Sequence, residues 1–201
     1  AHMWIQEGFA VYSEALYIEH KLGYNVMIDF LLKKREGIKN NLPIVGPVNE
    51  NYWAFGDSYN KGAWVLHTLR NAINNDDLWF STLKKFAVDN AKSHVSTETF
   101  LNYIIKATGK NYQLVFYQYF YDHRTPTFEY YQEDKMFYYR WSNVISDFAM
   151  PVDIDLNGVE KRLEVSEKLS SINISEHSVI HIRDWESLII TKRNPDLKKL
   201  N

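Results

Sequence analysis

The period of the hydrophobic pattern changes once along this 201-residue chain, and that change limits the folds open to it. In the first part, apolar residues recur at three- and four-residue steps, as at Trp4, Gly8 and Val11, which is the spacing of a buried helix face. In the second part they alternate every second residue, which is the spacing of strands with one buried face. We therefore expect a helical unit over residues 1–124 and a small antiparallel β-sandwich over residues 125–201.

Capping residues predict where the helices begin and end. Gly23 suits the position after the first helix, and Asn25 can cap the next one. Ser96 or Thr97 can cap a later helix that ends at Gly109. The first helix should be mostly buried, because a second apolar row lies beside its first. The expected helices are 4–22, about 26–36, 59–75, 75–91, 98–109 and the short segment 113–123.

Turn signals divide the second unit into strands. The pair Asn157-Gly158 inside an alternating run is a strong hairpin signal. Two more turns are expected, at Glu133-Asp134 and near Asp184–Glu186, and the last eight residues should form a loop. The expected strand pairs are 127–132 with 135–141, the two halves of 151–166 and the two halves of 178–192.

Composition excludes several classes of protein. Hydrophobic residues make up 45% of the chain and charged residues 24%, which is ordinary for a folded globular protein. The net charge of −2 implies no broad basic surface, so we expect no nucleic-acid partner. No apolar run reaches 18 residues, so no membrane span is expected. The absence of cysteine excludes disulfides and cysteine-ligated zinc here, and we favour a soluble, extracytoplasmic protein over a cytoplasmic one.

One carboxylate stands inside the apolar opening segment. Burying a charge without a partner is costly, so Glu7 needs a reason to be there. Glu14 lies seven residues later, on nearly the same helix face, with the small Ala10 between them. From spacing alone, a polar stripe that faces solvent is the favoured interpretation.

The surrounding residues change that judgement. The segment W-I-Q-E-G-F-A-V-Y-S-E, residues 4–14, resembles the part of the M1 family of zinc aminopeptidases that supplies the third zinc ligand. In that family an HExxH motif supplies two histidines, and a later Glu followed by Gly completes the site. The resemblance implies that Glu7 binds Zn²⁺. It also implies that Glu14 is an outer-shell acid near a metal-bound imidazole. Gly8 would let a neighbouring helix approach the ligand closely.

The sequence departs from that family pattern because it contains no HExxH. We expect the motif in an upstream part of the same chain. A lone carboxylate is a weak zinc ligand in water, so this segment alone should hold no zinc and hydrolyse nothing. His177 and His181 are four residues apart but fall in a strand pattern, and we interpret them as surface residues. We interpret His20 and His67 as structural.

A second motif follows in the order that the family shows. Residues 59–70 have the form Y-x-K-G-A-x-V-L-H-x-L-R, which looks like the M1 segment that carries the transition-state tyrosine. The resemblance implies that Tyr59 donates a hydrogen bond to the oxyanion as water attacks the peptide carbonyl. Asp57, two residues earlier, could assist it. The ordinary interpretation is that Tyr59 caps a core helix and that Lys61 is solvated. Two motifs in the right order favour the catalytic one.

Together these residues predict the C-terminal part of a zinc aminopeptidase. The implied fold is the helical C-terminal half of a thermolysin-like catalytic domain, followed by the β-sandwich. The full-length protein would use Zn²⁺ to hydrolyse N-terminal peptide bonds, and its partners would be a peptide substrate and the upstream part of the same chain. The alternative is a non-catalytic M1-like binding or scaffold protein, which retention of Glu7 and Tyr59 disfavours. A peptide-binding β unit is supported only by its aromatic residues.

Overall fold

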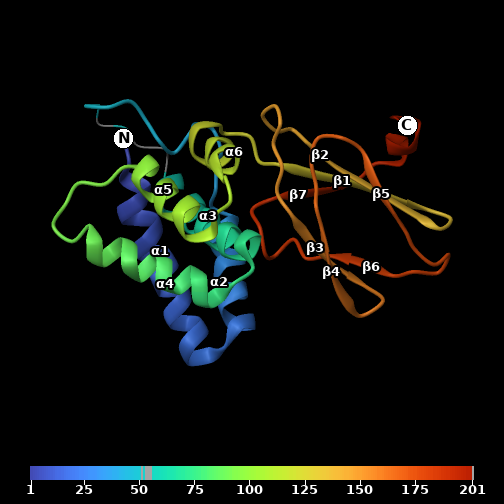
Figure 1. Ribbon diagram of the computed structural model, residues 1–201, viewed down its shortest axis with the longest axis horizontal. Helices are drawn as coiled ribbons and strands as arrows, with labels where there is room; N and C mark the ends of the chain where they lie inside the picture. Colours follow the sequence, from blue (N-terminus) through green and yellow to red (C-terminus); the bar gives the residue numbers. More distant parts are fainter. Residues whose placement is uncertain (51, 53–55, 201) are drawn as a thin grey trace. The chain divides into compact units, whose positions relative to one another are not determined.

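The computed structural model describes residues 1–50, 52 and 56–200, which divide into two compact units, Ala1–His123 and Arg124–Asn201 (Figure 1). The first unit is helical and the second contains two small β-sheets, as the change of hydrophobic period predicts. None of the helices among these residues combines the length and the apolarity needed to cross a membrane.

In the part of the first unit that the structure describes, six α-helices and one π-helix are present. Gly23 ends the first helix with a positive φ of 94°, as expected, and its N–H donates to the carbonyl of Glu19. The next helix begins at once, so Asn25 lies inside its first turn and the expected cap there is wrong. Ser96 caps the fifth helix, and Gly109 ends it. The helices are α1 (Met3–Leu22), α2 (Tyr24–Arg35), α3 (Asp57–Ile73), α4 (Asp76–Asp89), α5 (Thr97–Thr108), α6 (Gln113–Phe116) and the π-helix η1 (Tyr117–Tyr121).

The core of this unit forms around α3. Thirteen of its 17 residues are buried, so neighbouring elements cover it on nearly every side. In contrast, α1 buries only one stripe, whose members are Trp4, Gly8, Tyr12 and Ala15. The expectation of a mostly buried first helix is therefore wrong: Tyr17 and Leu22 are 64% and 65% exposed. The stripe contacts several elements, since Gly8 meets Gly62 of α3, whereas Tyr12 packs on Trp79 of α4.

The second unit contains two sheets with the strand orders β5-β2-β1-β7 and β4-β3-β6. Alternation is clear in β2, where Phe137, Tyr139 and Trp141 are buried and their neighbours are not. The hairpin of β3 and β4 turns at Asn157-Gly158, as predicted, with positive φ at both residues. The strands are β1 (Thr127–Glu133), β2 (Met136–Ser142), β3 (Val152–Leu156), β4 (Val159–Leu163), β5 (Ser170–Asn173), β6 (Ile180–Ile182) and β7 (Ile190–Arg193).

The end of the chain differs from the sequence prediction. β6 and β7 form no hairpin with each other: β6 pairs with β3, whereas β7 pairs in parallel with β1 in the other sheet. The buried Leu188 and Ile189 lie in the connecting segment, and their burial favours a crossing between sheets over a solvated turn. The predicted terminal loop is a 3₁₀-helix, η2 (Pro195–Leu200), anchored by the fully buried Leu197.

Candidate active site

Glu7 and Tyr59 meet where α1 faces α3. Glu7 lies in the second turn of α1 and is half-buried, and Tyr59 lies in the first turn of α3 with 36% of its surface exposed. The Glu7 carboxylate lies close enough to the Tyr59 hydroxyl to raise the pKa of Tyr59, through hydrogen bonding, desolvation and its negative charge. The phenol of Tyr59 and the carboxylate of Glu7 thus lie together at a partly exposed position of the helical unit.

The close crossing of the two helices explains why these residues meet. A Cβ built on Gly8 would lie 2.9 Å from the Cα of Gly62 and 3.2 Å from the carbonyl oxygen of Ser58. A Cβ on Gly62 would likewise lie 2.9 Å from the Cα of Gly8. Glu7 directly precedes one glycine of this contact, and Tyr59 stands three residues before the other. Backbone contact therefore brings the two side chains within reach of each other.

Both ends of α1 are held by specific contacts. At the start, the indole N–H of Trp4 donates to the hydroxyl of Thr97 over 2.8 Å, and its ring centroid lies 4.1 Å from that of Phe120. Near the far end, Glu19 accepts two hydrogen bonds from Arg70 of α3, of 2.6 and 2.9 Å. Glu7 therefore stands on a helix fixed on either side of it, as precise placement of a site residue requires.

Asp57 and Lys61 occupy the opposite side of α3 from Tyr59. Both Asp57 oxygens accept hydrogen bonds from backbone N–H groups, those of Lys39 and Asn40, over 2.8 and 2.7 Å. The expected role of Asp57 in assisting Tyr59 is thus replaced by that of a loop anchor. Lys61 is only 1% exposed, so the interpretation of a solvated lysine is wrong. The sequence signal that could have revealed it is a single charge within an otherwise buried run.

The other residues singled out from the sequence stand apart from this pair. Glu14 is exposed, and seven residues along α1 correspond to about 10 Å from Glu7. Ala10, between them, is exposed as well, so the strip that joins the two acids is open. His67 is fully buried and pairs with the side-chain amide of Asn71, 3.2 Å from its Nε2. That burial suits a structural histidine rather than a metal ligand.

The residues present supply only part of a zinc site. Within the described part of the chain, no group of three His, Cys, Asp or Glu side chains is arranged to hold a metal ion. Glu7 alone fits as a ligand, because its carboxylate is half-exposed and has a hydrogen-bond donor beside it. A catalytic zinc ion needs three protein ligands, so two more must come from elsewhere.

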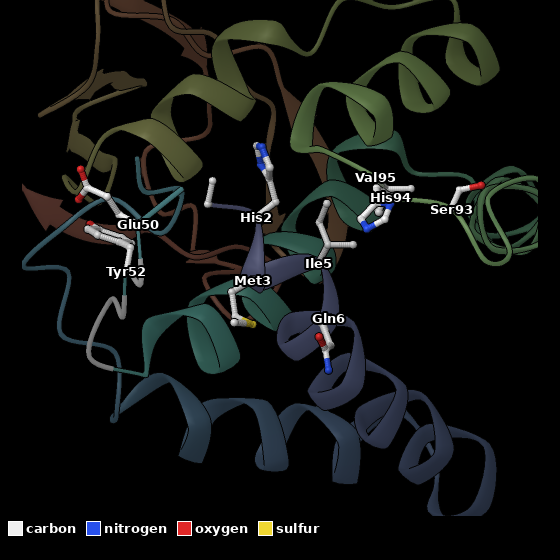
Figure 2. A pocket seen from close by; sticks show the side chains of 10 residues that line it. His2, Met3, Ile5, Gln6, Glu50, Tyr52, Ser93, His94 and Val95 are labelled. Carbon is white, nitrogen blue, oxygen red and sulfur yellow. The ribbon is translucent and has the colours of Figure 1, made fainter. Parts of the chain in front are cut away.

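A separate cavity of 440 Å³ lies at the N-terminal end of α1 (Figure 2). Its wall combines the first turn of α1 with Glu50, Tyr52 and residues 93–95, and neither Glu7 nor Tyr59 lines it. His2, at its edge, is held to α5 because its ring contacts the hydroxyl of Thr97 at 2.9 Å. The cavity is therefore not part of the Glu7–Tyr59 site.

The chain is similar to one known protein family and to solved structures. The model of the peptidase family M1 domain matches residues 1–119. Among solved structures, 109 chains match. One is the crystal structure of *Legionella pneumophila* aminopeptidase A in complex with aspartic acid, with 18% sequence identity and a TM-score of 0.74. That match covers 96% of the present chain but only 24% of the *Legionella* chain. No curated protein matches the sequence.

Proposed function

This chain belongs to peptidase family M1, and from that premise we propose that it is the C-terminal part of a zinc-dependent aminopeptidase. The observation that carries the proposal is the backbone contact of α1 and α3 at Gly8 and Gly62, which brings together Glu7 and Tyr59, the residues that the family motifs imply for metal binding and for catalysis. The chain spans about a quarter of the length of the *Legionella* structure that it resembles. We therefore propose that the two histidine ligands come from an HExxH motif in an upstream part of the same protein.

In this proposal Glu7 is the carboxylate ligand of the metal. When bound, zinc would supply an acidified water molecule and polarise the scissile carbonyl. Tyr59 would donate its hydroxyl to the oxygen on which negative charge develops. Because the Tyr59 hydroxyl lies beside the Glu7 carboxylate, it would also lie near an oxygen atom bound to the metal, which supports this role. Glu14 would accept the outer N–H of a ligand histidine and fix the orientation of its ring.

The substrate would be a peptide with a free N-terminus, cleaved at its first bond. The Legionella structure contains aspartic acid. The two motifs do not include the residues that would set which N-terminal amino acid of a substrate the present chain prefers. The alternative is a non-catalytic M1-like binding protein, in which Glu7 and Tyr59 would serve only to join α1 and α3.

Metal content and hydrolysis of the full-length protein test the proposal. We expect about one zinc ion per chain and cleavage of an aminoacyl-arylamide. Glu7→Gln should remove the metal, whereas Glu14→Gln should weaken zinc affinity by about 10- to 100-fold and keep the site. Glu36→Gln, the same change at an exposed carboxylate just after α2, is a matched control and should leave the zinc content unchanged. Full zinc content in the Glu7→Gln variant, or a parent protein without metal and activity, would favour the binding-protein alternative.

A further inference from the structure

Lys61 is a buried lysine two residues after Tyr59, and the proposed reaction does not use it. A buried ammonium group is costly unless hydrogen bonds compensate it. Its Nζ donates to the main-chain carbonyl oxygen of Asp122 over 3.3 Å. The carboxylates of Asp57 and Asp122 lie close enough to favour the charged form of the ammonium group. The buried Lys61 side chain therefore makes specific polar interactions in addition to packing in the core.

The partner of Lys61 lies at the end of the π-helix η1. The N–H of Asp122 closes that helix by donating to the carbonyl of Tyr117 over 3.0 Å, and Val45 donates to the carbonyl of Phe120 over 3.1 Å. Helix C-termini leave carbonyl oxygens without intrahelical partners and carry partial negative charge. The Lys61 ammonium satisfies one such oxygen and so joins α3 to the end of η1.

Asp57 makes the second connection, one turn earlier on the same face of α3. Its carboxylate holds the N–H groups of Lys39 and Asn40, which belong to the loop after α2. Residues four apart share a helix face, whereas Tyr59, midway between Asp57 and Lys61, points to the opposite side. Two anchors on one face fix the rotation of this part of α3 about its axis, and with it the direction of Tyr59.

We infer that Lys61 is a positioning residue for Tyr59, because it holds the first turns of α3 in the rotation that aims the Tyr59 hydroxyl at the Glu7 carboxylate. Its catalytic consequence rests on the proposed function, since it matters only if Tyr59 stabilises a transition state. Lys61 itself contacts neither Glu7 nor substrate in this arrangement. It acts through the helix.

A double-mutant cycle in the full-length enzyme tests this inference. Lys61→Met removes the donor and the charge at similar length, and it should lower kcat for an aminoacyl-arylamide by about 10- to 100-fold, with little change in KM. In a Tyr59→Phe background the same substitution should change kcat by less than about twofold, because the hydroxyl to be positioned is already absent. Equal losses in both backgrounds would overturn the inference.

Arg70→Met is the matched control, because Arg70 is also a buried cation of α3 and lies about 13 Å beyond Lys61 along the helix. Its effect on kcat should be the same in both backgrounds. If Lys61→Met does not fold, Lys61→Gln replaces it in the cycle, because it keeps an N–H donor without a buried charge. The Gln variant should retain most of kcat with Tyr59 present, and a loss of more than about tenfold would count against positioning through this hydrogen bond.

Hydrogen–deuterium exchange provides a readout that does not depend on activity. Amide exchange in residues 57–62 and 39–40 should be faster in the Lys61→Met protein, with α4 unchanged. Unchanged exchange in both segments would contradict the inference. If the unsubstituted full-length protein cleaves no arylamide, the proposed function fails by itself, while the exchange comparison still decides whether Lys61 holds α3.

Discussion

Gly8 of α1 and Gly62 of α3 are in backbone contact, close enough that a Cβ on either would lie 2.9 Å from the Cα of the other. This contact explains how a carboxylate and a phenol 52 residues apart come to share one site. It also connects the two sequence motifs physically, because each glycine directly follows or closely follows the residue to which the family resemblance assigns a role.

Gly8→Ala should destabilise the protein, although alanine is the better helix former. Helix propensity alone predicts a gain of about 1 kcal/mol in the free energy of unfolding. The contact with Gly62 predicts a loss of about 1–3 kcal/mol, because the added methyl group must push two backbones apart. Urea denaturation decides the sign. Ala10→Ser, at an exposed position of the same helix, is the control and should change stability by less than about 0.5 kcal/mol. A stabilised Gly8→Ala protein would contradict the close packing.

Tyr59→Phe should separate catalysis from metal binding. The substitution removes the hydroxyl that lies beside Glu7 and leaves the ring in place. In the full-length enzyme we expect kcat to fall about 10²- to 10³-fold, with zinc content and KM nearly unchanged, since one oxyanion donor is lost. Steady-state kinetics and metal analysis check this. Tyr52→Phe serves as a control, because Tyr52 donates to the carbonyl of Pro43 instead. Undiminished turnover in the Tyr59→Phe enzyme would exclude the proposed role.

Arg70→Met should destabilise the helical unit more than Asp76→Asn. Arg70 is 6% exposed and pairs with Glu19 and Asp76, whose side chains are 22% and 58% exposed. Loss of the arginine leaves Glu19 partly buried without its cation, at a cost of about 3 kcal/mol. Asp76→Asn should cost less than about 1 kcal/mol, because that carboxylate is largely solvated. Denaturant unfolding at pH 7 gives both values, and equal losses would contradict this order.

The ion pair of Asp76 with Arg70 also predicts that the stability of the folded protein falls in acid. The hydrogen bonds from Arg70 hold the pKa of Asp76 below its usual value of 3.8. The stabilisation is therefore complete above pH 3.8 and is lost as the pH falls below that value. The difference in unfolding free energy between the parent protein and Asp76→Asn should accordingly shrink under acid conditions. A difference that stays constant down to pH 2 would show that the pair does not stabilise the folded state.

Lys61 predicts that the free energy of unfolding also changes with pH in the alkaline range. Burial lowers its pKa from 10.5 to about 8, although the carboxylates of Asp57 and Asp122 oppose the shift. Between pH 8 and 10.5 the unfolded chain holds a proton that the folded chain has released, so this group stabilises the fold as the pH rises. The gain is on the order of 3 kcal/mol. Unfolding curves of Lys61→Met should lack it, whereas the exposed Lys84→Met should follow the parent. Parallel curves for Lys61→Met and parent would contradict a buried, shifted amine.

Much of the architecture could be predicted because its signals are local. The alternation of buried Phe137, Tyr139 and Trp141 is written in the order of the residues, as are the Asn157-Gly158 turn and the glycine that ends α1. The pairing of β7 was not predictable in the same way. Whether a strand pairs with its neighbour in sequence or with β1, 60 residues away, depends on which sheet edge its buried flank reaches.

The sequence by itself determined the helical and strand units, their order, and the family whose motifs contain Glu7 and Tyr59, because helix and strand periods and motif spacings are properties of neighbouring residues. Only the tertiary structure decided that Lys61 is buried on the carbonyl of Asp122, that Asp57 anchors a loop instead of assisting Tyr59, and that the Tyr59 hydroxyl faces Glu7. The physical reason is that these contacts depend on the separation and rotation of whole helices. Backbone contact at Gly8 and Gly62 fixes that geometry: the sequence indicated a close approach at Gly8, but only the fold shows that the approaching helix is α3.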